Sequence, residues 1–407
     1  MAERRRLVLL LGALSAFPAL TIDLYLPGMP EMARDLRADP GLVQLSVTVF
    51  MIGLAVGQVV VGPLSDAHGR RRLLLAGLAT YVAGSLACLA APSVGWLVAA
   101  RVVQSLGAAA ATVLARVIAR DHVDGSDLTR LVSALMLVNG VATVLGPIVG
   151  AQLLTVAPWR AVFVVLAATG AVLLVAVARV LPESLPVERR RPADPGATVL
   201  AFRTLLRDGA YLRHTLAAAL MFSAMFAYIA GSSFVLQDTY GLSAQQYGLV
   251  FALNAVGIVV LGQLNSALVG RVADERALLG ASLALGAVAG IGVLASVVGH
   301  APAAVLLACL FVLVAALGPV LANATSLALS PYPRSAGTAA SLQGVLQCVV
   351  SGGVASVMSL ASHDARSGAV AMGVAVAASA VAALVVFCSG AVRLPARRSE
   401  RLVAVRG

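Results

Sequence analysis

The chain has 407 residues, of which 60% are hydrophobic and only 12% are charged. A water-soluble protein of this length cannot bury so large an apolar fraction, so the composition excludes a soluble globular protein and indicates one surrounded by lipid. In such a protein the net charge of +11 belongs to loops that lie against anionic headgroups, and no nucleic-acid partner is expected.

Long charge-free segments predict an all-α membrane protein with twelve transmembrane helices. A span needs about 20 apolar residues, and charge-free runs such as 41–65 and 131–159 provide that length. The run 277–333 is too long for one helix and divides at the turn 299–302. The expected helices, each uncertain by about four residues at its ends, are 7–29, 42–64, 73–91, 96–119, 131–154, 161–181, 213–236, 247–270, 278–298, 303–325, 335–360 and 368–389.

The arginines predict the orientation of these helices. If the N-terminus is cytoplasmic, most arginines fall in cytoplasmic segments, and the outer loops keep only Arg34, Arg37, Arg160 and Arg366. This asymmetry predicts that both termini are cytoplasmic in a bacterial inner membrane. The first helix is too long for a removable signal peptide and lacks a small-residue cleavage site.

A polar segment divides the chain into two halves. Residues 1–181 form the expected N-terminal six-helix bundle, 182–212 a cytoplasmic linker rich in Pro and Arg, and 213–407 a second six-helix bundle with a short tail. A short surface helix is expected around Val199–Arg207. Two parallel six-helix repeats predict a transporter that binds its substrate between them, near the bilayer midplane. We expect it to act as a monomer.

Several kinds of catalytic or metal chemistry lack their sequence signatures. The four cysteines lie inside apolar helices without C-x-x-C spacing, which is typical of buried small hydrophobic residues. The sequence contains neither H-E-x-x-H nor G-x-x-x-x-G-K-[ST], so no metal, cofactor or P-loop nucleotide hydrolysis is expected.

The loop between the second and third helices carries a cluster of charged residues and glycines. Gly62 is expected to let another helix approach, Gly69 to make the tight turn, and Asp66 and Arg70 to form a charge pair four residues apart. Asp121 ends the fourth helix on the same side. We predict a latch of Asp66, Arg70 and Asp121 that holds the outward-open state and breaks on inward opening. The alternative is a positive loop that only anchors the topology.

Arg101 lies inside the fourth predicted helix and shares a stripe with Gln104 and Ser105. An arginine within a span costs roughly 2.5–3.5 kcal/mol on insertion scales, so we expect it to face a wet cavity. Alternatively, it reaches the outer headgroups.

The fifth predicted helix is interrupted by small residues. Gly140, Gly146 and Gly150 recur along it, and Pro147 follows Gly146 directly. Small residues at this spacing let neighbouring helices pack closely, and ordinary helix packing is one explanation for the pattern.

These motifs resemble those of a known family. The segment 62–72 resembles the G-x-L-a-D-r-x-G-r-k signature of the major facilitator superfamily, and the segment 140–151 resembles the antiporter motif of its exporting branches. Further segments resemble the Bcr/CflA drug-resistance branch of drug:proton antiporters: Asp23–Pro27 (D-x-Y-L-P), Trp159-Arg160, Pro182–Ser184, Tyr247–Asn254 and Gly337–Leu342. The resemblance implies a major facilitator fold and export of antibiotics or small metabolites. It departs at Ala322-Asn323, where the family has Pro-Asn and a helix break.

Asp23 is the one acid well inside a predicted span. An isolated carboxylate at such depth is functional by default, and moving one proton inward at 100 mV releases about 2.3 kcal/mol. Asp23 and Arg101 each lie about six residues, or roughly 9 Å, below the outer surface. We therefore predict that they form the proton-coupling site and face one another, directly or through water. The alternative is that Asp23 is a solvated residue at the outer mouth.

The substrate cavity is predicted to be apolar with sparse polar groups. Alternatively, more than half of the candidate residues pack against lipid or neighbouring helices. The candidates are Tyr25, Gln104, Asn139, Phe222, Met225, Phe226, Asn254 and Gln343.

The sequence thus predicts a proton-driven exporter of small molecules, whose partners are its substrate, protons and the bilayer. A proton-coupled importer of a small metabolite on the same fold is the first alternative. A membrane sensor or intramembrane enzyme is the second, but we find neither a catalytic dyad nor a soluble domain.

Overall fold

The computed structural model describes residues 2–122, 125–186, 195–332, 336–362 and 364–389, and these are almost entirely helical. Within these described residues, eleven helices are long and apolar enough to cross a membrane, and α6 contributes the shorter apolar segment Leu137–Leu153. The prediction of twelve spans is therefore confirmed. The long helices are α1 (Ala2–Asp23), α3 (Pro40–His68), α4 (Arg70–Leu89), α5 (Val94–His122), α6 (Gly125–Leu153), α7 (Arg160–Val180), α9 (Gly209–Phe234), α10 (Ala244–Leu268), α11 (Glu275–Val298), α12 (Ala303–Leu329), α13 (Ala336–Leu360) and α14 (Ala365–Cys388).

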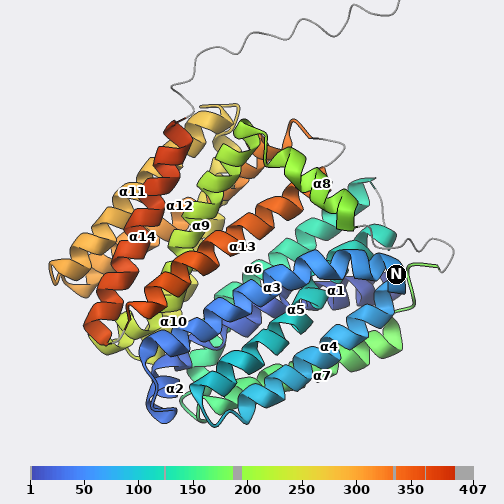
Figure 1. The fold of residues 1–407 in the computed structure, drawn as a ribbon, viewed down its shortest axis with the longest axis horizontal. Helices are drawn as coiled ribbons and strands as arrows, with labels where there is room; N and C mark the ends of the chain where they lie inside the picture. The colour runs from blue at the N-terminus through green and yellow to red at the C-terminus, as the bar shows by residue number, and fades with distance from the viewer. Residues whose placement is uncertain (1, 123–124, 187–194, 333–335, 363, 390–407) are drawn as a thin grey trace, which may run out of the picture.

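The long helices form two bundles that lie side by side (Figure 1). The N-terminal bundle contains α1 and α3 to α7, and the C-terminal bundle contains α9 to α14. The bundles meet where α3 packs against α13 and α6 packs against α10. We call the end that carries the short helix α2 (Met29–Asp35) the distal end, and the end that carries α8 (Pro195–Leu205) the linker end. α8 begins four residues and ends two residues before the surface helix expected at 199–207.

The first helix ends six residues before its predicted end. α1 stops at Asp23, and a single 3₁₀ turn, η1 (Leu26–Gly28), leads into α2. Pro27 has no N–H to donate to the Asp23 carbonyl, so the α-helical ladder cannot continue through this point. The predicted helix 7–29 was wrong at this end, and Asp23 lies at a helix break rather than within a continuous helix.

Capping residues set other helix ends in the C-terminal bundle. Ser243 and Gln246 form a reciprocal capping box at the start of α10, and Asp274 caps α11. α12 runs unbroken through Ala322-Asn323 despite Pro319. The helix break that the family has there is absent from this chain.

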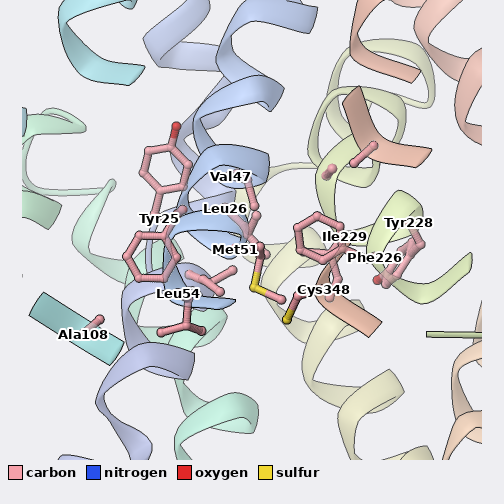
Figure 2. Packing of buried hydrophobic residues seen from close by; sticks show 14 of the residues in the cluster. Tyr25, Leu26, Val47, Met51, Leu54, Ala108, Phe226, Tyr228, Ile229 and Cys348 are labelled. Atoms are coloured by element: carbon pink, nitrogen blue, oxygen red, sulfur yellow. The ribbon is translucent and has the colours of Figure 1, made fainter. Parts of the chain in front are cut away.

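The two bundles are in close contact at the distal end. The Gly41 amide of α3 donates to the Ser362 carbonyl at 3.1 Å, and nearer the middle Met51 of α3 lies in one apolar cluster with Ile229 of α9 and Cys348 of α13 (Figure 2). These contacts close the structure between the bundles at the distal end. Towards the linker end, by contrast, a Cβ added to Gly344 of α13 would meet no described atom within 4 Å.

Candidate functional site

Asp23 lies at the break between α1 and η1, and its side chain is 5% exposed. The neighbouring Thr143 hydroxyl of α6 donates to the Asn139 carbonyl at 3.1 Å. A Cβ added to Gly146 would lie 2.7 Å from the Asp23 Cβ. The buried acid is therefore held against the helix that carries the glycine motif, and not at a solvated mouth.

Two of the three motif glycines are required by this packing. Besides Gly146, which touches Asp23, Gly150 lies against the Leu24 carbonyl so closely that any side chain would overlap it. Gly140 has nothing within 4 Å of its would-be Cβ. Gly146 and Gly150 of the motif on α6 therefore pack against the helix break, whereas Gly140 makes no such contact.

Arg101 is fully buried in the N-terminal bundle. Its guanidinium carbon lies 4.7 Å from the centre of the Tyr25 ring and 4.3 Å from that of Phe50, which are cation–π distances. Nη1 donates to Gln104 Oε1 at 2.7 Å, and the Gln104 amide donates to Ser85 Oγ at 2.8 Å. Two aromatic rings and an amide therefore surround the guanidinium.

Asp23 and Arg101 do not form an ion pair. Within the described part of the chain, no salt bridge joins them, and Arg101 Nε and Nη2 have no hydrogen-bond partner. They make no direct contact in this structure, because the helix break turns Asp23 towards α6 and places the Tyr25 ring over the guanidinium. That the two residues form the proton-coupling site, in contact through water, stays a prediction. The Tyr25 hydroxyl is itself hydrogen-bonded to Ser46.

The C-terminal bundle supplies partners that the sequence analysis missed. Ser233 of α9 donates to the Leu26 carbonyl at 2.7 Å, and Gln237 donates to the Pro27 carbonyl at 3.1 Å. These carbonyls lie at the break, where helical bonding is interrupted. The sequence signal was the pair Ser232-Ser233 near the end of an apolar helix, where buried hydroxyls need partners.

The two helices of the C-terminal bundle that contact η1 carry buried aromatic hydroxyls. Tyr228 of α9 and Tyr247 of α10 are both buried. The Asn254 amide donates to Tyr228 Oη at 2.8 Å. Because η1, which follows Asp23, contacts both α9 and α10, the helix break lies between the two bundles.

The candidate cavity residues fall into two groups. Tyr25, Gln104, Phe226, Asn254 and Gln343 are buried, and all but Phe226 have hydrogen-bond partners inside the protein. Figure 2 shows Phe226 among the packed side chains of the apolar cluster. Asn139, Phe222 and Met225 are only partly buried.

The charged cluster at the linker end is formed. Arg70 pairs with Asp66 and with Asp121, the latter at 3.3 Å. Glu183, which the sequence analysis did not include, accepts from the Arg70 amide at 2.8 Å. Gly69 makes the predicted tight turn with a φ of 97°. The three predicted latch residues are therefore in contact in a structure whose distal end is closed, and the breaking of this latch on inward opening stays a prediction.

Gly62 does not have its predicted packing role in this structure. A Cβ added there would meet nothing within 4 Å. Among the residues that the structure describes, no neighbouring helix therefore approaches Gly62 closely in this arrangement. As for metals, the residues described here include no group of three or more His, Cys, Asp or Glu side chains that could hold an ion.

Comparison with known proteins identifies the family. The family model for the Major Facilitator Superfamily matches residues 9–356. The chain belongs to this superfamily. An uncharacterized transporter of the major facilitator type, YdgK of Bacillus subtilis, is 37% identical over 84% of this chain and 86% of its own length.

Two further relatives are named for drug resistance. A bicyclomycin resistance protein homolog of Haemophilus influenzae is 32% identical over 84% of this chain and 86% of its own. Multidrug resistance protein D of Escherichia coli is 28% identical over 87% of this chain and 88% of its own.

Solved structures of other transporters share the fold. A bacterial homolog of the lysosomal transporter Spinster aligns with a TM-score of 0.75 at 16% identity, covering 96% of both chains. A D-xylose-proton symporter aligns with a TM-score of 0.74 at 16% identity, over 94% of this chain and 97% of its own. The chain is therefore a multi-pass membrane protein with the major facilitator fold.

Proposed function

We propose that this protein is a proton-coupled antiporter that exports small drugs or metabolites by alternating access. The observation that carries the proposal is the Asp23 carboxyl, buried at a helix break between the two bundles and packed against Gly146 of the antiporter-type motif. The charge of a titratable group at this place acts on both bundles, so its protonation state can affect how they pack together. Its contacts must change when the distal end opens.

In the cycle that we propose, each state of Asp23 permits a different movement. With the distal end closed, Asp23 releases its proton towards the cytoplasm and a substrate enters between the bundles. The loaded protein opens outward, a proton from outside binds Asp23, and the substrate leaves. The proton carries about 2.3 kcal/mol per 100 mV, which supports roughly a 50-fold gradient of a neutral compound.

The relatives support export over import. Two are named for resistance to bicyclomycin or to multiple drugs, which is the phenotype that an exporter produces. The importer alternative rests on a shared fold, as in the xylose–proton symporter, and fold alone does not set the direction of transport. We also place the protein in a bacterial inner membrane, where it acts as a monomer without enzymatic activity. The arginine asymmetry described above supports the cytoplasmic position of both termini.

Drug susceptibility tests this function. An efflux-deficient bacterial host expressing the chain is challenged with bicyclomycin, chloramphenicol and a panel of unrelated drugs. We expect the minimal inhibitory concentration of at least one compound to rise several-fold, and a protonophore or the variant Asp23→Asn to abolish the increase.

The same cells separate export from import. Cells preloaded with the protected compound should lose it faster when they express the chain, and this loss should depend on the proton gradient. Faster proton-dependent accumulation of that compound would contradict export and favour the importer.

A further inference from the structure

An apolar groove lies on the outside of the C-terminal bundle, between α13 and α14. Its volume is about 700 Å³, and its walls are formed by residues between 353 and 361 at the end of α13 and between 367 and 379 of α14. Both helices pack on α9 (Figure 1). Val357 and Val374, one on each wall, are 70% and 48% exposed, so the groove opens away from the protein. Because both helices span the membrane, it opens onto the acyl chains of the bilayer.

The groove has the length of one leaflet. On α14 it begins at Ser367, next to the distal start of the span Arg366–Cys388, and ends at Ser379. These two serines are 12 residues apart, which corresponds to roughly 18 Å at about 1.5 Å per residue. The hydrocarbon core of a bilayer is about 30 Å thick, so one leaflet contributes roughly 15 Å. The groove therefore runs from the distal headgroup region to about the middle of the bilayer.

A polar pocket adjoins the distal end of this groove. It has a volume of about 290 Å³, and its lining includes Arg366, His300 and Tyr240. Arg366 is exposed and forms no ion pair among the residues that the structure describes. Val370 lines both the pocket and the groove, so the two meet on the first turns of α14. A guanidinium and an imidazole thus lie at the headgroup end of an apolar groove.

The acids near the pocket leave Arg366 available to a ligand. Asp364 accepts from the Ser367 amide at 2.7 Å in the capping box of α14. Asp238 of η3 (Val235–Thr239) lies beside the pocket without lining it. A guanidinium forms charge-assisted, bidentate hydrogen bonds with phosphate, and neighbouring carboxylates can accept from the hydroxyl or ammonium groups of a headgroup. The pocket therefore offers contacts to both parts of a phospholipid headgroup.

We propose that this surface binds one glycerophospholipid of the distal leaflet, with its phosphate at Arg366 and His300 and one acyl chain in the groove between α13 and α14. A transmembrane helix of a second copy fits less well, because it would cross the whole bilayer whereas the groove spans one leaflet. The exported compound is not the occupant, because the groove faces away from the contact between the two bundles. The proposal therefore does not depend on the direction or the substrate of transport.

Native mass spectrometry of the full-length protein tests the site. Protein that has been delipidated in a mild detergent is titrated with phosphatidylglycerol. We expect one lipid molecule to bind saturably to the wild type. Arg366→Gln should weaken this binding several-fold, because it removes the charge that holds the phosphate. Ala378→Phe should also weaken it several-fold, because Ala378 lines the groove and the added ring occupies the space of the acyl chain.

Two matched variants separate this site from general effects of charge and bulk. Arg37→Gln removes another exposed arginine of the distal end, which lies outside both the pocket and the groove. Ala281→Phe adds the same ring at an exposed position of α11, which lies outside the groove. Both variants should bind phosphatidylglycerol as the wild type does. A phospholipid with a photoreactive acyl chain should label peptides within 353–379 more strongly than the rest of the chain.

The proposal is overturned if the wild type binds no lipid saturably, or if Arg366→Gln and Ala378→Phe bind it like their controls. Arg366→Gln changes an exposed side chain, so it decides the question if Ala378→Phe does not fold. Glycerol phosphate, which lacks acyl chains, should not displace the lipid, and displacement would show that the pocket holds a soluble anion instead. Dimers that Ala378→Phe abolishes would identify a second copy as the occupant and would also overturn the proposal.

Discussion

Arg70 joins three segments of the N-terminal bundle at one point. It pairs with Asp66 on α3 and Asp121 on α5, and its amide binds Glu183 after α7. None of these contacts involves the other bundle. The cluster therefore holds three segments of the N-terminal bundle together at the linker end.

Asp66→Asn should accordingly reduce turnover more than substrate affinity, because the cluster lies far from Asp23. We expect several-fold slower transport with little change in the half-saturating concentration. Initial rates over a range of substrate concentrations measure both quantities. Asp39→Asn, outside the cluster, is the control, and an equal loss of affinity in Asp66→Asn would contradict this assignment.

Asp208 holds the start of α9 at the linker end. It accepts from the Ala210 and Tyr211 amides and from the Tyr332 hydroxyl. The Tyr332 hydrogen bond is the main reason why the pKa of Asp208 lies below its usual range. The same bond raises the pKa of Tyr332 to about 12.

Tyr332→Phe should therefore destabilise the protein by about 1 kcal/mol or less at neutral pH, since Asp208 is largely solvated. A carboxylate with a lowered pKa stabilises the fold above its ordinary pKa, and this contribution disappears as the pH falls through the folded-state value. Thermal unfolding at several pH values checks this. The difference from wild type should shrink as the solution is acidified, and a difference that grows in acid would contradict the account.

At the scale of single residues, the sequence predicted identities better than contacts. The charge pair of Asp66 and Arg70 followed from their separation by four residues across the turn at Gly69, and the burial of Asp23 followed from the apolar residues around it in the sequence. The partners of Arg101 did not, because the rings of Tyr25 and Phe50 come from other helices. Cross-helix contacts depend on how the helices rotate and break, which spacing within a single helix does not determine.

At the scale of helices, α6 determines how tightly the helix break is held. Gly150 lies against the Leu24 carbonyl, whereas Gly140 faces no atom within 4 Å. Gly150→Ala should force a backbone shift costing roughly 1–3 kcal/mol and remove most transport. Gly140→Ala adds the same methyl group without a clash and should leave transport near the wild-type level.

Efflux rates at matched expression measure this pair of variants. If Gly140→Ala were as defective as Gly150→Ala, small residues along α6 would matter for general packing rather than for the helix break. The break itself was foreseeable from Pro27 alone. We missed it because hydropathy continues through the segment 24–29 and suggested one uninterrupted helix.

At the scale of the whole molecule, the two six-helix bundles followed from hydropathy and from the polar linker, since each span must satisfy its own backbone in lipid. The closed distal end did not, because it depends on contacts between bundles such as that of Gly41 with Ser362. A sequence that supports alternating access must fit more than one arrangement, so hydropathy cannot select one of them.

Topology reporters test the proposed orientation. A reporter inserted after Arg191, in the linker outside the described residues, should be active as a cytoplasmic fusion. One inserted at Ala38, between α2 and α3, should be active only as an external fusion. The same answer from both sites would contradict the proposed topology.

The central claim is that Asp23 exchanges a proton for the substrate. Purified protein in weakly buffered detergent solution, mixed with the compound that it exports best, should release up to one proton per molecule bound near neutral pH. Asp23→Asn should still bind the compound but release none, and Asp23→Glu should retain part of the release. Undiminished proton release from Asp23→Asn would contradict the account, because the coupling carboxyl would then lie elsewhere.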